Sequence, residues 1–171
     1  MSTQKLKLGF IGLGIMGGPM AHHLLKAGHQ LFTHTRSKTP DYLQQNGAVL
    51  CASAFEVAQQ TDIVFLMLPD MDFGPRESIF VPFFGIPSAT LTAPARLTAA
   101  TQGQVIPVVT RFLPDYRGWK VIFYPAWDDY PGDDMSAATR RMNAFIEARI
   151  LEEPSEYFWS HKRFKTRPPG V

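Results

Sequence analysis

The sequence predicts an α/β fold in which residues 1–70 form one half of the chain and residues 71–171 the other. Up to residue 70, apolar strands alternate with helices, which is typical of a parallel sheet built from right-handed βαβ units. The first strand also runs directly into a glycine-rich turn and an amphipathic helix. From Met71 onward prolines and aromatic residues become more frequent, so we expect a different α/β arrangement in the second half.

The first half begins with an apolar strand, Leu6–Ile11, followed by the turn "GLGIMG". Gly12, Gly14 and Gly17 have the spacing G-x-G-x-x-G. The first glycine permits a tight turn, the second lets the backbone approach a pyrophosphate, and the third allows close helix packing. Apolar residues at helical spacing continue to Gly28, which suits the end of a helix. This order predicts a Rossmann-like dinucleotide site, with a purely structural glycine turn as the alternative.

The second strand, in "QLFTHTRS" over residues 30–37, ends where such a fold faces the adenosine ribose. NAD-binding proteins commonly place Asp or Glu there, and a carboxylate would repel a 2′-phosphate. This stretch carries no carboxylate, and Arg36 is the candidate clamp for a 2′-phosphate. The sequence therefore favours NADP(H) over NAD(H). The alternative is that Arg36 and Lys38 are ordinary surface charges.

The remaining elements of the first half follow from the same patterns. They are a short helix up to Asn46, a brief strand near Val49, a helix around Phe55–Gln60 and a buried strand Ile63–Leu68.

In the second half, "VPFFGIPSATLTAPARLTAATQG" predicts an apolar loop followed by a helix from about Thr92 to Thr101. The stretches "QVIPVVTRFLP" and "WKVIFYPAW" predict two antiparallel strands joined by the turn "DYRG". An amphipathic helix follows in "DDMSAATRRMNAFIEARILEEP", with Asp133 or Asp134 as its cap and Pro154 at its end.

Two carboxylates and one histidine of the second half are candidate chemical groups. Asp70 and Asp72 would share one face in a strand, where paired carboxylates can do acid/base or metal work, whereas in a loop they serve as turn or capping residues. His161 has no visible partner in the sequence, which favours a structural role over a catalytic base. No Cys/His or His/carboxylate cluster has ligand spacing, so no metal site is expected.

The segment "GFIGLGIMGGPMAHHLLKAGH" resembles the N-terminal signature of the β-hydroxyacid dehydrogenases, the family of 3-hydroxyisobutyrate dehydrogenase and tartronate semialdehyde reductase. "DIVFLMLPD" resembles that family's fourth strand and the following loop, so the resemblance covers residues 5–70. It implies cofactor contacts at Gly12, Leu13, Gly14, Met16, Gly17, Arg36, Leu68 and Pro69. The family's D-A-P-V-S-G-G segment and its G-x-G-x-x-x-K-x-x-N lysine do not occur in the sequence. Because hydride transfer needs a positioned proton donor, we expect binding without useful turnover.

The segments "LPDMDFGPRESIFVPFFGIPSATLTAPARLTAATQGQVIPVVTRF" and "MNAFIEARILEEPSEYFWSHKRFKTRPPG" resemble the C-terminal half of the lipid A biosynthesis lauroyl acyltransferases. Those membrane-associated enzymes move an acyl chain from acyl carrier protein to a lipid A precursor. Over residues 68–170 the resemblance implies acyl-chain or anionic-substrate contacts at Asp70, Asp72, Phe73, Gly74, Arg76, Arg96, Arg163, Lys165 and Arg167. The family's catalytic pattern H-x-x-x-x-D/E follows none of the 5 histidines. Both families place "LPD" at the end of a parallel strand, so we hypothesise that one sheet continues into the other.

Composition limits the class of partner and the location. The net charge of +2 is too small to indicate nucleic-acid binding. The basic stretch "HKRFKTR" is either a solvated tail or a contact for an anionic headgroup or phosphate. The lone Cys51 forms no internal disulfide, and we find neither a signal peptide nor an apolar run of membrane-spanning length. A cytoplasmic location is expected, with peripheral attachment at the inner face of the cytoplasmic membrane as the alternative.

The sequence thus predicts a fusion-type chain with NADP(H)-binding capacity and without the full catalytic activity of either family. The alternatives are a lipid A biosynthesis acyltransferase or a nonfunctional fusion product. The expected partners are the dinucleotide and either anionic lipid or acyl carrier protein. Sheet edges or helix faces left exposed in the chain would also favour self-association.

Overall fold

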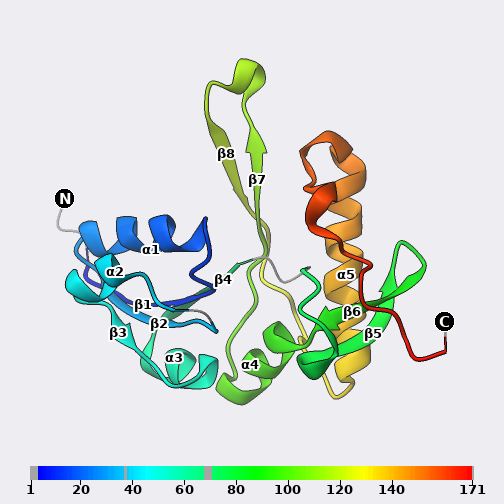
Figure 1. Ribbon diagram of the computed structural model, residues 1–171, viewed down its shortest axis with the longest axis horizontal. Helices are drawn as coiled ribbons and strands as arrows, with labels where there is room; N and C mark the ends of the chain where they lie inside the picture. Colours follow the sequence, from blue (N-terminus) through cyan, green and yellow to red (C-terminus); the bar gives the residue numbers. More distant parts are fainter. Residues whose placement is uncertain (1–3, 37, 68–70, 171) are drawn as a thin grey trace. The chain divides into compact units, whose positions relative to one another are not determined.

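A computed structural model describes residues 4–36, 38–67 and 71–170 of the protein (Figure 1). Its backbone contacts divide the chain into two compact units, Met1–Leu68 and Pro69–Val171. The fold is α/β, and its N-terminal unit is a parallel sheet of βαβ units as the sequence predicts.

The first unit is a four-stranded parallel sheet in the order β3-β2-β1-β4. Helix α1 lies on one face of this sheet and α3 on the other (Figure 1). Its elements are β1 Lys7–Ile11, α1 Gly17–Lys26, β2 Gln30–His34, α2 Asp41–Gln45, β3 Val49–Leu50, α3 Ala54–Gln60 and β4 Ile63–Leu66.

The strand β1 is buried on both faces, which explains its nearly continuous apolar sequence. Leu8 and Phe10 point to one side and belong to the main core with Leu31. On the other side, a Cβ added to Gly9 would lie 2.6 Å from Cγ1 of Val57 in α3. Glycine at this position therefore lets α3 pack directly against the central strand.

The second unit contains two separate antiparallel hairpins, β5-β6 and β7-β8, and the long helix α5. Its elements are η1 Pro75–Glu77, β5 Ser78–Phe83, β6 Ile86–Leu91, α4 Ala93–Thr101, β7 Val108–Phe112, η2 Pro114–Tyr116, β8 Trp119–Phe123, α5 Met135–Glu152, η3 Pro154–Glu156 and η4 Trp159–His161. Every described strand pairs within its own unit, so the hypothesis of one continuous sheet is wrong.

The apolar loop expected before α4 is also wrong, because this segment forms the hairpin β5-β6. Phe84 and Gly85 both have positive φ, 50° and 77°, as a two-residue type I′ turn requires. Pro82 and Pro87 face each other one position before the pair that closes the turn. At that non-hydrogen-bonded pair the N–H groups point away from the partner strand, so proline removes no ladder hydrogen bond.

Three other elements of the second unit confirm the sequence analysis. Helix α4 begins one residue after Thr92, and β7 and β8 pair antiparallel across the predicted turn. Helix α5 is capped by Asp134, whose Oδ1 accepts from the backbone N–H of Ser136 at 2.7 Å and of Ala137 at 3.2 Å. Of the two cap candidates, Asp134 is therefore the one that caps the helix.

Candidate functional site

The glycine-rich turn between β1 and α1 has three positions with different steric demands. Gly12 adopts φ of +100°, in the left-handed region that favours glycine. A Cβ on Gly17 would lie only 1.9 Å from the carbonyl oxygen of Gly12, so glycine allows α1 to start this close to the turn. A Cβ on Gly14 would meet no atom of the described residues within 4 Å. The backbone of Gly14 therefore faces open space.

Side chains around the turn divide into an anchor and an open rim. Leu13 is 3% exposed and packs into the main core, which holds the turn on the sheet. Ile15 and Met16 are 97% and 61% exposed. Met16 is also the N-cap of α1, and no described side chain caps this helix end. The N–H groups and positive dipole end of α1 are thus open to a ligand or to water.

The carboxyl ends of three parallel strands meet at this turn. Ile11 at the end of β1 is in register with His34 of β2 and with Leu66 of β4. The N–H of Gly12 donates to the carbonyl oxygen of His34 at 3.4 Å, and the N–H of Met67 donates to that of Ile11 at 3.4 Å. The chain crosses from β2 and β3 on one side of β1 to β4 on the other. The turn therefore lies at a topological switch point, where open α/β sheets bind ligands.

The end of β2 carries the basic group that the sequence analysis selected. Arg36 is exposed and lies two residues beyond His34, at the edge of the sheet that also holds Gly12. The nearest acidic residue along the chain after it is Asp41, which forms an exposed ion pair with Lys38 at 3.0 Å. A guanidinium at the end of such a strand can bind an anionic group of a ligand.

These features fit a dinucleotide. An open glycine backbone lies next to an uncapped helix end, and an exposed guanidinium follows the neighbouring strand. Among the predicted cofactor contacts, the structure brings Gly12, Leu13, Gly14, Met16 and Gly17 together in the turn and puts Arg36 at the same sheet edge. Leu68 and Pro69 lie outside the described residues, as does Asp70.

In the second unit, Asp72 is buried and its carboxylate is used within the protein. It accepts from the backbone N–H of Thr166 at 2.8 Å, from the Thr166 hydroxyl at 2.9 Å and from the N–H of Gly74 at 2.9 Å. These bonds join the start of the unit to its C-terminal segment. With an exposed fraction of 4%, the Asp72 carboxylate links these two segments within the second unit.

Arg163 is buried in the same way. Its guanidinium donates to the carbonyl oxygen of Ala89 at 2.8 Å and to the hydroxyl of Thr90 at 2.7 Å, and it lies 4.7 Å from the ring centroid of Phe83. Asn143 contributes a further acceptor at 3.4 Å. Arg163 therefore fastens the C-terminal segment to the hairpin β5-β6, and its exposed fraction of 3% leaves little surface for an external anion.

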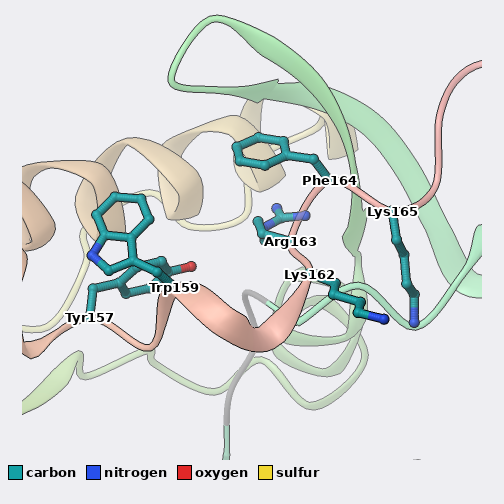
Figure 2. Close-up of a pocket in the computed structure, with 6 residues that line it drawn as sticks. All are labelled: Tyr157, Trp159, Lys162, Arg163, Phe164 and Lys165. Carbon is teal, nitrogen blue, oxygen red and sulfur yellow. The ribbon is translucent and has the colours of Figure 1, made fainter.

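A cavity of about 330 Å³ lies beside this buried arginine (Figure 2). It is lined by Tyr157, Trp159, Lys162, Arg163, Phe164 and Lys165. Figure 2 shows the side chains of Lys162 and Lys165 extending to the same side of the segment, away from the rings of Tyr157 and Trp159. Arg163 and Lys165 were predicted from the sequence as substrate contacts, whereas the aromatic walls were not, although aromatic and basic residues lie close together in "YFWSHKRFK".

The other predicted substrate contacts lie elsewhere. Arg76 is an exposed residue of η1 and Arg96 an exposed residue of α4, and neither lines the cavity. Arg167 is exposed, and its guanidinium lies 6.0 Å from the ring centroid of Phe164.

The remaining features that the sequence raises are metal binding, the single cysteine and membrane-spanning length. No cluster of three or more His, Cys, Asp or Glu side chains there could hold a metal ion. Burial, followed by the nearby Glu56 carboxylate, raises the pKa of the Cys51 thiol, which keeps it protonated. Within residues 4–36, 38–67 and 71–170 no helix has the length and apolar character needed to cross a membrane.

The parallel βαβ sheet and the glycine turn of the first unit are typical of dinucleotide-binding domains. Residues 7–73 match the family model of the NAD binding domain of 6-phosphogluconate dehydrogenase. The chain is 52% identical over 65 residues to 2-hydroxy-3-oxopropionate reductase of Escherichia coli K12, a match that covers 38% of this chain and 22% of the reductase.

Residues 52–166 match the family model of the bacterial lipid A biosynthesis acyltransferases, and the chain belongs to that family. It is 40% identical over 104 residues to the lipid A biosynthesis lauroyltransferase of Escherichia coli K12, covering 60% of this chain and 34% of that enzyme. The palmitoleoyltransferase of the same organism is 37% identical over 103 residues, covering 60% of this chain and 33% of the enzyme. The chain thus spans about a third of the acyltransferases and about a fifth of the reductase.

Both resemblances seen in the sequence are therefore confirmed. The chain is chimeric, because it joins a dehydrogenase-type NAD-binding segment to a lipid A acyltransferase segment. The two family matches overlap over residues 52–73, which contain α3, β4 and the "LPD" shared by both patterns.

Proposed function

We propose that this protein is a dinucleotide-binding module that holds NADP(H) in preference to NAD(H) and carries out no hydride transfer with its own residues. The observation that supports this proposal most directly is the open backbone at Gly14 beside the uncapped N-terminus of α1. Backbone N–H groups at such a turn bind a pyrophosphate, and the positive end of the helix dipole adds to the attraction.

The preference for NADP(H) rests on Arg36. A guanidinium at the end of β2 can form two parallel charge-assisted hydrogen bonds with a 2′-phosphate. The residues from Thr33 to Lys38 offer no carboxylate to accept from a ribose 2′-hydroxyl. NADP(H) therefore gains an ion pair at this position, whereas NAD(H) gains nothing equivalent.

The lack of turnover follows from the residues of the dinucleotide unit itself. A bound nicotinamide dinucleotide supplies a hydride, but reduction of a carbonyl also needs a group that donates a proton to the developing alkoxide. The lysine pattern that provides this proton in the resembled dehydrogenases is not in the sequence. Binding and reduction should therefore separate in this chain.

Thermal unfolding with and without cofactor tests this proposal. At a concentration of about 100 times its dissociation constant, a ligand stabilises its site by about 2.7 kcal/mol, a shift of several degrees for a unit of this size. We expect a larger shift with NADPH than with NADH. Arg36→Ala should weaken NADPH binding about tenfold or more and leave NADH binding unchanged. Lys26→Ala, which removes the same charge at the C-terminal end of α1, is the matched control.

Two results would contradict the proposal. A transition that responds to neither dinucleotide would mean that the glycine turn binds no cofactor. An equal loss of NADPH and NADH binding in Arg36→Ala would remove the basis for the preference.

A second candidate function is supported by the cavity beside Arg163. We propose that it takes the phosphate-bearing headgroup of an anionic lipid, with the rings of Tyr157, Trp159 and Phe164 against the apolar part and the ammonium groups of Lys162 and Lys165 near the phosphate. The combination suits a molecule that is apolar at one end and anionic at the other.

Flotation with lipid vesicles tests this second function. We expect binding to vesicles with about one third phosphatidylglycerol and none to pure phosphatidylcholine, lost in Lys162→Glu/Lys165→Glu. Arg117→Glu/Lys120→Glu, the same charge change at exposed positions of the β7-β8 hairpin, is the control. Equal binding by both double variants would contradict a role for the cavity. Binding to acyl carrier protein in place of vesicles would assign the two lysines to an acidic protein partner instead.

A further inference from the structure

The β7-β8 hairpin has two faces that differ in exposure. In the antiparallel register, Val108 pairs with Phe123, Thr110 with Val121 and Phe112 with Trp119. Side chains alternate across a strand, so these six residues share one face of the hairpin. All six are exposed, and Phe123, Trp119 and Val121 retain 70%, 57% and 53% of their accessible surface. We call this set the hairpin face.

The opposite face carries the pairs Val109–Ile122 and Arg111–Lys120 and is packed within the second unit except at the exposed Lys120. Arg111 donates to the carbonyl oxygen of Arg149 at 2.6 Å and to the carboxylates of Glu152 and Glu156 at 3.3 Å and 3.4 Å. The backbone N–H of Phe112 also donates to Oε1 of Glu156 at 2.9 Å. These bonds hold the hairpin against the end of α5 and η3, so the hairpin face is presented in a defined orientation.

This arrangement is unusual for a two-stranded hairpin. A hairpin of two strands is at most marginally stable in water by itself, and its apolar face normally packs on a core. Here the half-buried Val109, Ile122 and Arg111 lie on one side, and an additional apolar surface is exposed on the other. The rings of Phe112 and Trp119, with centroids 3.9 Å apart, form a continuous platform near the turn. An exposed apolar surface of this kind marks an interaction site.

A second copy of the same chain fits this surface. The hairpin face carries no charged side chain, so two copies can bring their faces together without burying a charge. Phe112, Trp119 and Phe123 keep 39%, 57% and 70% of their surface exposed, which is about 250–400 Å² at about 150–250 Å² for each aromatic side chain. With the two valines and Thr110, the face can bury about 500 Å² per copy and about 1,000 Å² in a pair. That area reaches the lower limit for a specific interface.

We propose that two copies of the protein associate through their hairpin faces around a two-fold axis, forming a small two-layer sandwich of four strands. A two-fold interface uses the same patch on both copies, which a flat, uncharged and self-complementary surface permits. Packing of two apolar sheet faces about 10 Å apart would cover the rings and valines of both hairpins. The contact is apolar, so its strength should not depend on salt.

Sedimentation equilibrium of the whole chain tests the proposal. Because the interface is at the small end of the specific range, the mass should rise from one chain to two between about 1 and 200 µM protein. Phe123→Asp should raise the dissociation constant about a hundredfold or more, because each copy would place an unpaired carboxylate in the apolar contact. Leu151→Asp, which adds the same charge at a 69% exposed apolar position of α5, should leave it unchanged.

A second variant and a salt series distinguish loss of the interface from loss of the fold. Val121→Thr/Phe123→Thr removes apolar surface but keeps β propensity, and its unfolding transition shows whether the hairpin still forms. The pair should persist when NaCl is raised from about 0.1 to 1 M, whereas an association of opposite charges would weaken. A single-chain mass over the whole concentration range would overturn the proposal. A pair that Phe123→Asp and the threonine variant both leave intact would also overturn it.

Discussion

Replacing Gly17 by alanine should destabilise the first unit, whereas replacing Gly14 by alanine should not. A Cβ on Gly17 would lie 1.9 Å from the carbonyl oxygen of Gly12 and 3.1 Å from Cε1 of Phe10. The first neighbour is backbone, so it cannot turn aside as a long side chain can. The start of α1 would have to move by about 1 Å to restore a normal contact distance of more than about 3 Å.

The size of the effect follows from opposing contributions. Forcing extra volume into a packed site costs about 1–3 kcal/mol, and a rigid backbone neighbour puts Gly17→Ala at the upper end. Alanine gives back up to about 1 kcal/mol, because it restricts the unfolded chain and favours the helix. We expect a net loss of about 2 kcal/mol, or a fall of roughly 8–16 °C in Tm for a unit of this size.

Gly14→Ala is the matched comparison. It adds the same methyl group, but no atom of the described residues lies within 4 Å of that Cβ, and φ of Gly14 is not in the left-handed region. Its stability should change by less than about 0.5 kcal/mol. Its NADPH-induced shift in Tm should nevertheless disappear, because the methyl group occupies the space through which the backbone meets the pyrophosphate.

Thermal unfolding of the two variants, each with and without NADPH, provides the assay. The reasoning would be refuted if Gly17→Ala unfolded at the temperature of the parent chain. It would equally be refuted if Gly14→Ala kept the full NADPH response.

Three further predictions concern the second unit. Asp72→Ala should lower the free energy of unfolding of the second unit by about 2–4 kcal/mol, because three donors lose a buried acceptor. Asp133→Ala, at an exposed position, should change this free energy little, and urea unfolding compares the two variants. Arg163→Met should lower the free energy of unfolding by about 3 kcal/mol or more, because the acceptors on Ala89 and Thr90 of the β5-β6 hairpin lose their donor. Lys162→Met should leave it almost unchanged. A similar loss of stability in both variants would contradict the buried role of Arg163. Burial raises the pKa of Tyr130 to about 12, with Arg141 acting in the opposite direction, so the neutral phenol is favoured in the folded state. The neutral Tyr130 side chain therefore stabilises the folded state fully below its unfolded pKa of about 10. As pH rises from about 10 to about 12 the free energy of unfolding should fall by about 1–2 kcal/mol, and Tyr130→Phe should remove this fall.

The sequence alone was sufficient for the elements that depend on local chemistry. Gly12 and Gly17 are required by a backbone angle and a short contact within one turn, and both are visible as a spacing of glycines. Helix α5 follows from its apolar spacing and from Asp134 at its start. The division into two families followed from motifs, since each family's residues are contiguous in the chain.

The β5-β6 hairpin could not be predicted with the same rules. Proline normally argues against a strand, and "VPFFGIP" carries two prolines and no Asn-Gly turn. Only the register shows that Pro82 and Pro87 face each other at a position where neither strand needs an N–H. The two prolines therefore cost the hairpin no hydrogen bond, because they lie opposite each other at this position.

Tertiary structure alone decided the roles of the charged residues. Asp72 binds Thr166, which is 94 residues away, and Arg163 binds Ala89, which is 74 residues away. The resemblance to the acyltransferases implied substrate contacts for both side chains. Their buried partners could not be foreseen, because charged groups are mostly exposed and these partners are not adjacent in the sequence. Whether a charged side chain is buried, and which group it binds, is decided only when distant segments of the chain meet. The exposure of the hairpin face is likewise visible only in the folded chain. The sequence by itself determined which families are joined and where the dinucleotide turn lies, whereas the folded chain decided which charges hold the protein together.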